Sequence, residues 1–461
     1  MYRNISIRGG KFLYAVRNQA AATAFRGRPW DERDAIEAVV KHHLRLGHNV
    51  VCRLVPDENW YQGGFNVCAI VEFVAGDLVT PYVFRCPLPH KLAEQRYPGT
   101  VDDKVLCEAG TYVWVQDKCP EIRVPKLYAF GTGSNRHSAP VIDTAYMLLE
   151  YIQPETGEPL MYTWAEHMND SDKQKRLYKG MTRIMLSLAK LPQPHIGSFR
   201  FDPDDATVSL SARPLTCTMM LFEHGDTPRT IQPNRVYNNT DSFVTDMLTM
   251  YDTQLLHNPH AAGDANDAKE RIAMRAMIRS VAQYIAPELR NGPFLLQLTD
   301  FHQSNIMVDK DWNVTCLIDL EWISALPAES LSVPYWLTGC SIDTIIDDAY
   351  PVFDEARKLS LQTMEENGKH IHPKHNIHIT DVMQRSWDSK AVWFWACLRS
   401  IDGWLLVFES NILPKYTSNT SFVADLKNLS AIWHENFDKV VKRKVADEEK
   451  YQETLRELFL R

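Results

Sequence analysis

The sequence contains no run of eighteen or more apolar residues, and it does not begin with a charged segment followed by an apolar core. A helix that crosses a bilayer needs about 20 apolar residues, and a secretory signal needs an apolar core of its own. We therefore expect neither a membrane span nor a cleaved signal.

Cysteine spacing and basic charge set further limits. The nine cysteines include no Cys-x-x-Cys pair, which argues against a disulfide framework and a structural zinc site and favours reduced thiols in a cytoplasmic protein. The net charge is −8, and the one stretch rich in lysine and arginine, residues 439–444, fits a solvated helix face. Without a larger basic patch, nucleic acid is not expected as a main partner.

What the chain does have is the composition of a folded protein. Hydrophobic residues make up 45% of the sequence and aromatic residues 10%, which indicates packed domains rather than disorder. A chain of 461 residues exceeds what a single core usually organises. Two or three lobes are therefore expected.

Two nearby stretches combine the groups that MgATP chemistry requires. Residues 298–305 read Leu-Thr-Asp-Phe-His-Gln-Ser-Asn, and residues 318–322 read Ile-Asp-Leu-Glu-Trp. Asp300 would orient and deprotonate an attacking hydroxyl. The amide oxygen of Asn305 and the carboxylate of Asp319 would hold Mg²⁺, which neutralises charge on the phosphates.

A hairpin would bring these groups together. Residues 306–308 and 314–318 are short β-rich runs separated by a polar turn. Asn305 would come just before the first strand and Asp319 just after the second, so both could face one cleft. Each acidic or amide residue alone could be an ordinary turn former or strand cap. Only their combination favours an active site.

These motifs resemble those of the aminoglycoside phosphotransferase and choline kinase superfamily, relatives of the protein kinases, and more narrowly a set of fungal proteins that carry this domain. The family's catalytic loop usually reads His-Gly-Asp-x-x-x-x-Asn, and its metal motif reads Ile-Asp-x-Glu. Here Leu298 and Thr299 replace the histidine and glycine, whereas the spacing from Asp300 to Asn305 is kept. These two replacements leave phosphate transfer possible, but they leave its rate open.

The resemblance implies an α/β (α+β) protein with the bilobal, protein-kinase-like fold. Residues 1–48 would form an N-terminal helical extension and residues 49–153 a small β-rich nucleotide-binding lobe. Residues 154–461 would form a larger, mainly helical lobe with the catalytic loop, the metal motif and an acceptor region. The implied ligands are ATP, Mg²⁺ and a small molecule with a hydroxyl group.

The first lobe would supply the phosphate contacts. Gly63 and Gly64 lie between two predicted strands, where glycines with positive φ can turn backbone N–H groups toward phosphate; a plain hairpin turn explains them equally well. By the resemblance, Arg85 takes the place of the cation that contacts the phosphates, and Glu108, on a helix predicted over residues 101–115, pairs with it. Glu108 could equally be solvent-exposed.

Residues 145–152 resemble the last strand and the hinge of that lobe. Hinge backbone groups normally bind the adenine edge, so the resemblance implies nucleotide contacts at Glu150, Tyr151 and Ile152. An apolar run of this length would also suit a buried strand of any α/β protein.

The second lobe leaves several interpretations open. We expect its main helices over residues 173–191, 242–250 and 268–285. Asp343, Asp347 and Asp348 accompany a region rich in tryptophan, which could bind an amino-bearing acceptor by cation–π contact or could simply be core. Glu321 could contact a second metal ion or a substrate amine, or anchor its loop.

Two histidines lie in predicted loops. His195 and His302 could transfer protons, but a histidine in a loop is more often structural. We expect His302 to support the catalytic loop.

The sequence thus predicts an ATP-dependent phosphotransferase that transfers the γ-phosphate of MgATP to a hydroxyl of a small molecule, which could carry an amino group. Protein kinase activity is not expected, because no activation segment bounded by Asp-Phe-Gly and Ala-Pro-Glu motifs is present. Two alternatives remain: a pseudokinase-like binding or scaffold protein, and a kinase fold reused for another transfer reaction in specialised metabolism.

Overall fold

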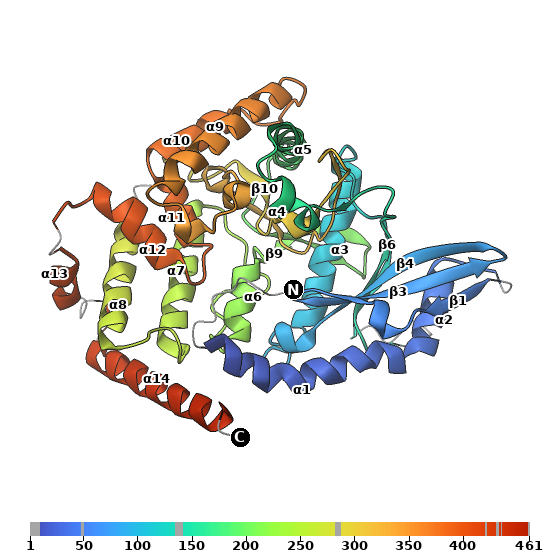
Figure 1. Cartoon of the computed structure of the whole chain (residues 1–461), viewed down its shortest axis with the longest axis horizontal. Helices are drawn as coiled ribbons and strands as arrows, with labels where there is room; N and C mark the ends of the chain where they lie inside the picture. The colour runs from blue at the N-terminus through green and yellow to red at the C-terminus, as the bar shows by residue number, and fades with distance from the viewer. Residues whose placement is uncertain are drawn as a thin grey trace.

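The computed structural model describes residues 10–47, 50–133, 142–281, 287–419, 422–429, 433–434 and 436–459. The protein has two parts (Figure 1): a sheet lobe, from α1 to β6, and a helical lobe, from β7 to α14. This is the bilobal, mixed α/β architecture that the sequence predicts.

One antiparallel sheet organises the sheet lobe, with strand order β1-β3-β4-β6-β5 and a short β2 paired to β3. Its strands are β1 (Val51–Leu54), β2 (Tyr61–Gln62), β3 (Asn66–Ala75), β4 (Leu78–Pro87), β5 (Leu127–Gly131) and β6 (Tyr146–Glu150). β3 is rich in β-branched and aromatic residues, which favour strands. A two-residue turn joins β3 to β4, and Gly76 supplies the positive φ that such a turn requires.

Three helices accompany the sheet: α1 (Gly10–Asp31), α2 (Arg33–His43) and α3 (Thr100–Lys118). In the view of Figure 1, α1 runs beneath the sheet and α3. α2 packs Ile36, Val39 and Val40 against the apolar residues of β1, β3 and β4 because these three side chains share one face of the helix. The helix predicted over residues 101–115 is α3.

α3 also borders the helical lobe. Gly110 lets the helix lie directly against β8, since a Cβ there would be 2.8 Å from the backbone nitrogen of Phe201. The carboxylate of Glu94 accepts hydrogen bonds from the N–H groups of Gly99 and Val101 at 2.6 and 2.7 Å. These bonds satisfy N–H groups at the start of α3, which lack partners within the helix.

The helical lobe contains short strands and many helices. Its strands are β7 (Glu158–Pro159), β8 (Ser198–Asp202), β9 (Thr207–Ala212), β10 (Phe294–Leu298), β11 (Ile306–Val308), β12 (Val314–Leu317) and β13 (Ile323–Pro327). Its helices are α4 (Trp164–His167), α5 (Ser171–Ala189), α6 (Cys217–His224), α7 (Thr240–His257), α8 (Ala265–Ser280), α9 (Ala349–Gly368), α10 (Ile379–Asp388), α11 (Ala391–Cys397), α12 (Trp404–Val407), α13 (Phe422–Leu429) and α14 (Phe437–Phe459).

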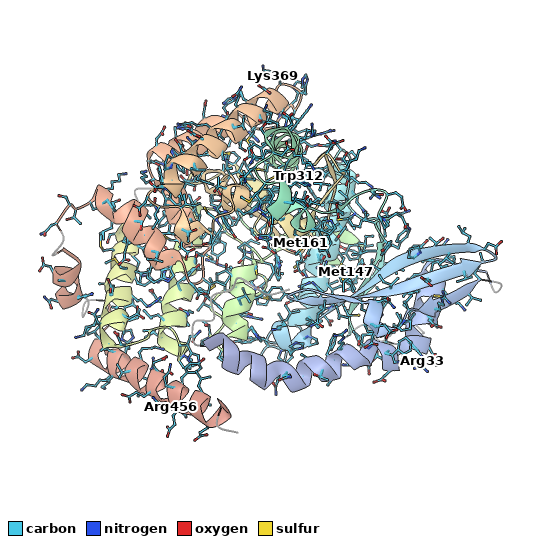
Figure 2. All side chains as sticks on the ribbon, in the orientation of Figure 1. Arg33, Met147, Met161, Trp312, Lys369 and Arg456 are labelled. Atoms are coloured by element: carbon cyan, nitrogen blue, oxygen red, sulfur yellow. The ribbon has the colours of Figure 1, made fainter. Side chains whose placement is uncertain are left out.

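The three helices predicted for this lobe correspond to α5, α7 and α8. The prediction extended α8 to residue 285, but the helix ends at Ser280, and residues 282–286 lie outside the described part of the chain. Figure 2 shows Trp312 inside the helical lobe and Met147 on the side of the sheet lobe that faces the helical lobe. Both side chains are buried.

The tryptophan-rich region is core. Four of its tryptophans, Trp387, Trp393, Trp395 and Trp404, are buried in the largest hydrophobic cluster of the described residues, and Trp336 is buried in a second cluster. Large aromatic side chains contribute strongly to core burial. The structure therefore favours a core role for these tryptophans and not the binding of an acceptor.

All nine cysteines are free thiols. Among the described residues, no helix combines the length and the apolar character that crossing a bilayer requires.

Candidate active site

The two sequence motifs lie against each other because β10 and β13 pair. β10 leads into the catalytic loop, and β13 follows the metal motif, with Leu298 opposite Ile323. Thr299 donates from its N–H and its hydroxyl to the carbonyl of Trp322, at 3.0 and 2.7 Å. A threonine in place of the family's glycine therefore adds a second bond between the motifs.

Asn305 joins the same two segments from the other side. The side-chain Nδ2 of Asn305 donates to the main-chain carbonyl of Asp300 at 2.9 Å. The main-chain carbonyl of Asn305 accepts from the N–H of Ile318 at 2.9 Å. The Oγ of Ser304 donates to the amide oxygen of Asn305 at 3.1 Å. This orientation leaves Oδ1, the atom suited to a metal ion, facing away from Asp300.

The predicted hairpin is present as β11 and β12, with Ile306 opposite Leu317. This register places Asn305 and Asp319 at the same end of the hairpin. Asp319 has φ of +63°, a left-handed conformation that is uncommon outside glycine. Such strain persists where surrounding contacts fix the backbone, and it often occurs at functional sites.

Trp336, farther along the helical lobe, also holds the catalytic loop. The indole N–H of Trp336 donates to the carbonyl of Phe301 at 2.6 Å. His302 packs with its ring centroid 6.2 Å from that of Trp336, and burial lowers its pKa. This position agrees with a supporting role for His302.

Arg85 connects the lobes. Its guanidinium forms an ion pair with Glu108, donates to Asp319 at 2.6 Å and lies 3.2 Å from Glu321. Burial alone would lower the pKa of Arg85, but Asp319, Glu108 and Glu321 outweigh that effect and raise it. The structure therefore brings Arg85 and Glu108 together, and it adds two carboxylates of the metal motif to the pair.

Sequence reasoning missed two members of this cluster, Lys104 and Asn66. Lys104 is buried in α3, 2.5 Å from Glu321 and 3.3 Å from Glu108. The amide of Asn66 donates to Glu321 at 2.8 Å. The spacing of Lys104 and Glu108, four residues apart on a helix, was a usable signal for the first member; Asn66 gave none.

The carboxylates differ in their electrostatic surroundings. The Asp300 side chain reaches solvent, but protein surrounds most of its carboxylate. This burial, together with the negative charge of Glu321, raises the pKa of Asp300 to about 6. Burial also raises the pKa of Asp319. Burial opposes ionisation of Glu321 as well, but Lys104 and Arg85 lower its pKa overall. Glu321 is thus held as an anion, and Asp319 is the carboxylate that an additional cation would stabilise most.

The glycine turn differs from the expectation. Neither Gly63 nor Gly64 has positive φ. The N–H of Gly63 donates to the carbonyl of Asn66 at 2.9 Å, so the turn uses this group within the hairpin. Of the two interpretations that the sequence left open, these observations favour the plain hairpin turn.

The hinge residues end β6. The N–H of Glu150 donates to the carbonyl of Lys126 at 2.9 Å, and its carboxylate binds Arg123 and the N–H of Lys126. Ile152, in contrast, makes no backbone hydrogen bond to another described residue. Of these two positions, Ile152 is the one whose backbone polar groups remain available to a ligand.

The donor set fits magnesium. Among the described residues, no group of three or more His, Cys, Asp or Glu side chains is placed to hold a metal by itself. Mg²⁺ in nucleotide sites is commonly bound by one or two carboxylates, with phosphate oxygens and water as the other ligands. The carboxylate of Asp319 and the amide oxygen of Asn305 suit that arrangement.

Comparison with known proteins places these features in context. The model of a family described as "Phosphotransferase enzyme family" matches residues 94–325, about half of the chain, including α3 and both motifs. No curated protein matches the chain.

Two solved structures are similar over most of their length. A spectinomycin phosphotransferase in complex with ADP and spectinomycin shares 11% identity and a TM-score of 0.36, with 90% of this chain and 98% of that chain covered. A protein assigned as a fructosamine-3-kinase, from Haemophilus somnus 129PT, shares 11% identity and a TM-score of 0.34, with 87% and 98% covered. Because both scores are low, these two structures carry no further argument.

Proposed function

The chain belongs to the phosphotransferase enzyme family, and from this premise we propose that it transfers the γ-phosphate of MgATP to a hydroxyl of a small molecule. The observation that carries the proposal is the set of hydrogen bonds that holds Asp300, Asn305 and the residue before Asp319 together. Asn305 holds the backbone of Asp300, and the N–H of Ile318, next to Asp319, donates to Asn305.

In this proposal Asp300 orients the acceptor hydroxyl and takes its proton. A pKa of about 6 keeps this carboxylate ionised at neutral pH while leaving it a better base than an ordinary aspartate. Transfer would be direct and in line, without a covalent enzyme intermediate. Mg²⁺, which Asn305 and Asp319 would hold, supplies charge neutralisation at the phosphates.

The sheet lobe would bind the nucleotide. We assign phosphate contact to Arg85, which Glu108 braces from α3, and to the turn at Gly63 and Gly64. Arginine can bind phosphate with two parallel hydrogen bonds. The hinge at Glu150 and Ile152 would contact adenine, and the open backbone of Ile152 supports that part of the assignment.

The acceptor is proposed to be amino-bearing. The buried tryptophans do not support this, but Tyr335 is 39% exposed, and burial, Asp300 and Asp343 raise its pKa. An exposed aromatic ring that feels the charges of the Asp300 and Asp343 carboxylates suits a cationic group.

The division of the chain is proposed as well. We assign residues 49–153 to the nucleotide-binding lobe and residues 154–461 to the lobe with the catalytic loop. The nine free thiols support a reducing, cytoplasmic location.

One observation favours a second candidate, a pseudokinase-like binding protein. Arg85 already contacts three carboxylates, Glu108, Asp319 and Glu321. A phosphate group would have to compete with them for the guanidinium. Such competition would weaken nucleotide binding or turnover.

Product analysis separates these candidates. The purified chain is incubated with MgATP and pools of amino-alcohols and hydroxylated metabolites, and ADP, AMP and pyrophosphate are quantified. Acceptor-dependent ADP release that is lost in Asp300→Asn supports the phosphotransferase. Release of AMP or pyrophosphate instead indicates a reused fold, and nucleotide binding without any product indicates a binding protein.

A further inference from the structure

A buried lysine lies beside the proposed metal site without taking part in the chemistry described above. Lys104 in α3 is 1% exposed. Its ammonium lies 2.5 Å from Glu321 and 3.3 Å from Glu108, and it donates to the amide oxygen of Asn66 at 3.1 Å. A lysine is almost never fully buried unless it is paired, so this cation has a defined set of partners.

Glu321 is the partner that connects Lys104 to the site. Its carboxylate accepts from Asn66 at 2.8 Å and lies 3.2 Å from Arg85. All three contacts are to Oε2 of Glu321, so this oxygen has little capacity left for a second metal ion or a substrate amine. Of the interpretations that the sequence left open, the contacts favour an anchor for the loop.

The anchored loop carries Asp319, only two residues away. Asp319 has a left-handed backbone conformation, which costs free energy and persists only where surrounding contacts determine it. The N–H of Ile318 is bonded to Asn305 on one side, and the carbonyl of Trp322 to Thr299 on the other. Glu321 adds a side-chain ion pair that links this segment to α3.

The charge balance gives Lys104 a second effect. Two cations, Arg85 and Lys104, face three carboxylates, Glu108, Asp319 and Glu321. Without Lys104, all three anions would depend on Arg85. With it, Glu321 and Glu108 keep a cation when Arg85 turns toward another anion.

We propose that Lys104 is a positioning residue for phosphate transfer: by holding Glu321 it fixes the strained loop of Asp319 to helix α3. This inference rests on the proposed function, because it assigns Asp319 to the metal. It predicts that Lys104 affects magnesium affinity more than nucleotide affinity.

The test is a magnesium titration of ADP binding, measured by calorimetry on the full chain. Removing a group that orients a metal ligand commonly costs about 10- to 100-fold in metal affinity. Lys104→Met is therefore expected to raise the half-saturating Mg²⁺ concentration about 10- to 100-fold. ADP binding without Mg²⁺ is expected to stay within about twofold of wild type.

Lys444→Met is the matched control. Lys444 is also 1% exposed, but its acidic neighbour is Asp447, at 3.8 Å, in α14. This variant loses a buried cation at a distance from the site. It is expected to lower stability and leave the magnesium dependence unchanged.

A second variant covers the case in which Lys104→Met does not fold. Lys104→Met with Glu321→Gln removes the cation and its anion together, so the net charge of the cluster stays as it is in wild type. It is expected to fold and still to show the raised magnesium requirement.

Two results are decisive against the inference. If wild type binds ADP with magnesium and both Lys104 variants keep its half-saturating concentration, the inference is overturned while the proposed function stands. If wild type shows no magnesium-dependent ADP binding, the proposed function itself fails and the inference fails with it.

Discussion

Arg85 donates from Nη2 to the carboxylate of Asp319 at 2.6 Å, and this bond joins strand β4 of the sheet lobe to the metal motif of the helical lobe. The same guanidinium pairs with Glu108 on α3. Three segments far apart in the chain therefore meet at one buried cation. The position of the proposed phosphate contacts relative to the proposed metal site therefore depends on Arg85.

Removing this cation is expected to be costly. Arg85→Met leaves Glu108 and Asp319 without their main partner, and breaking a buried ion pair on one side costs about 3–5 kcal/mol. The free energy of unfolding in urea is expected to fall by that amount. Arg53→Met is the control on the same sheet, because Arg53 is 60% exposed and pairs with Glu72; it should change stability by less than about 1 kcal/mol. Equal effects of the two variants would contradict the role of Arg85.

Asp300→Asn tests the assignment of the base. The amide keeps the size of the side chain but cannot accept the acceptor's proton, so kcat is expected to fall by about 10²- to 10⁴-fold. The dissociation constant for MgATP should stay near the wild-type value. Asp311→Asn, an exposed residue of the β11–β12 turn, is the control and should retain activity. A variant of Asp300 with nearly full activity would remove this residue from the mechanism.

Gly110→Ala tests the contact between α3 and β8. The added methyl group would lie 2.8 Å from the nitrogen of Phe201 and 2.9 Å from the carbonyl carbon of Arg200. The backbone must move apart, and overpacking of this kind costs about 1–3 kcal/mol. Because α3 carries Glu108 and Lys104, nucleotide binding should weaken as well.

Gly27→Ala is the matched control for that variant. Gly27 lies in α1, and a Cβ there meets no atom within 4 Å. Alanine has the higher helix propensity, so stability is expected to stay equal or to rise by up to about 1 kcal/mol. A Gly110→Ala protein as stable as this control would show that α3 and β8 are not in tight contact.

The protein is expected to lose stability in acid through His224, at the end of α6. Burial, with Lys91 and His90 nearby, lowers the pKa of His224 to about 4. The unfolded chain, with a histidine pKa near 6.5, binds the proton first as the pH falls. The contribution of His224 is thus fully present above pH 6.5 and is lost toward pH 4, a difference of about 3 kcal/mol.

Urea unfolding of wild type and His224→Gln across pH 7 to 4 measures this effect. The stability difference between the two proteins should shrink or reverse by about 3 kcal/mol over that interval. His372→Gln, at an exposed position, should follow the wild-type curve. Parallel curves for wild type and His224→Gln would show that this histidine is not the sensitive group.

The sequence predicted those parts of the site that are local in the chain. β11 and β12 form the predicted hairpin because short β-rich runs and a polar turn between them are short-range signals. Helix α3 was found in the same way, from its apolar spacing. The roles of the site residues remain predictions that the experiments above address.

Contacts between distant residues were not predictable in this way. Asn66 and Glu321 are 255 positions apart, and nothing in either local pattern specifies their hydrogen bond. Strand β13 was missed because it follows the metal motif at once, without a turn signal of its own. The sequence left the conformation of Gly63 and Gly64 open, because glycine permits positive φ without requiring it.

The most direct test of the central claim is thermal unfolding of wild type and Asp319→Ala, each with and without millimolar MgATP. A ligand at a hundred times its dissociation constant stabilises the native state by about 2.7 kcal/mol, which raises Tm by a few degrees. The phosphotransferase proposal predicts a magnesium-dependent rise in wild type that is absent in Asp319→Ala. No rise in either protein would contradict it.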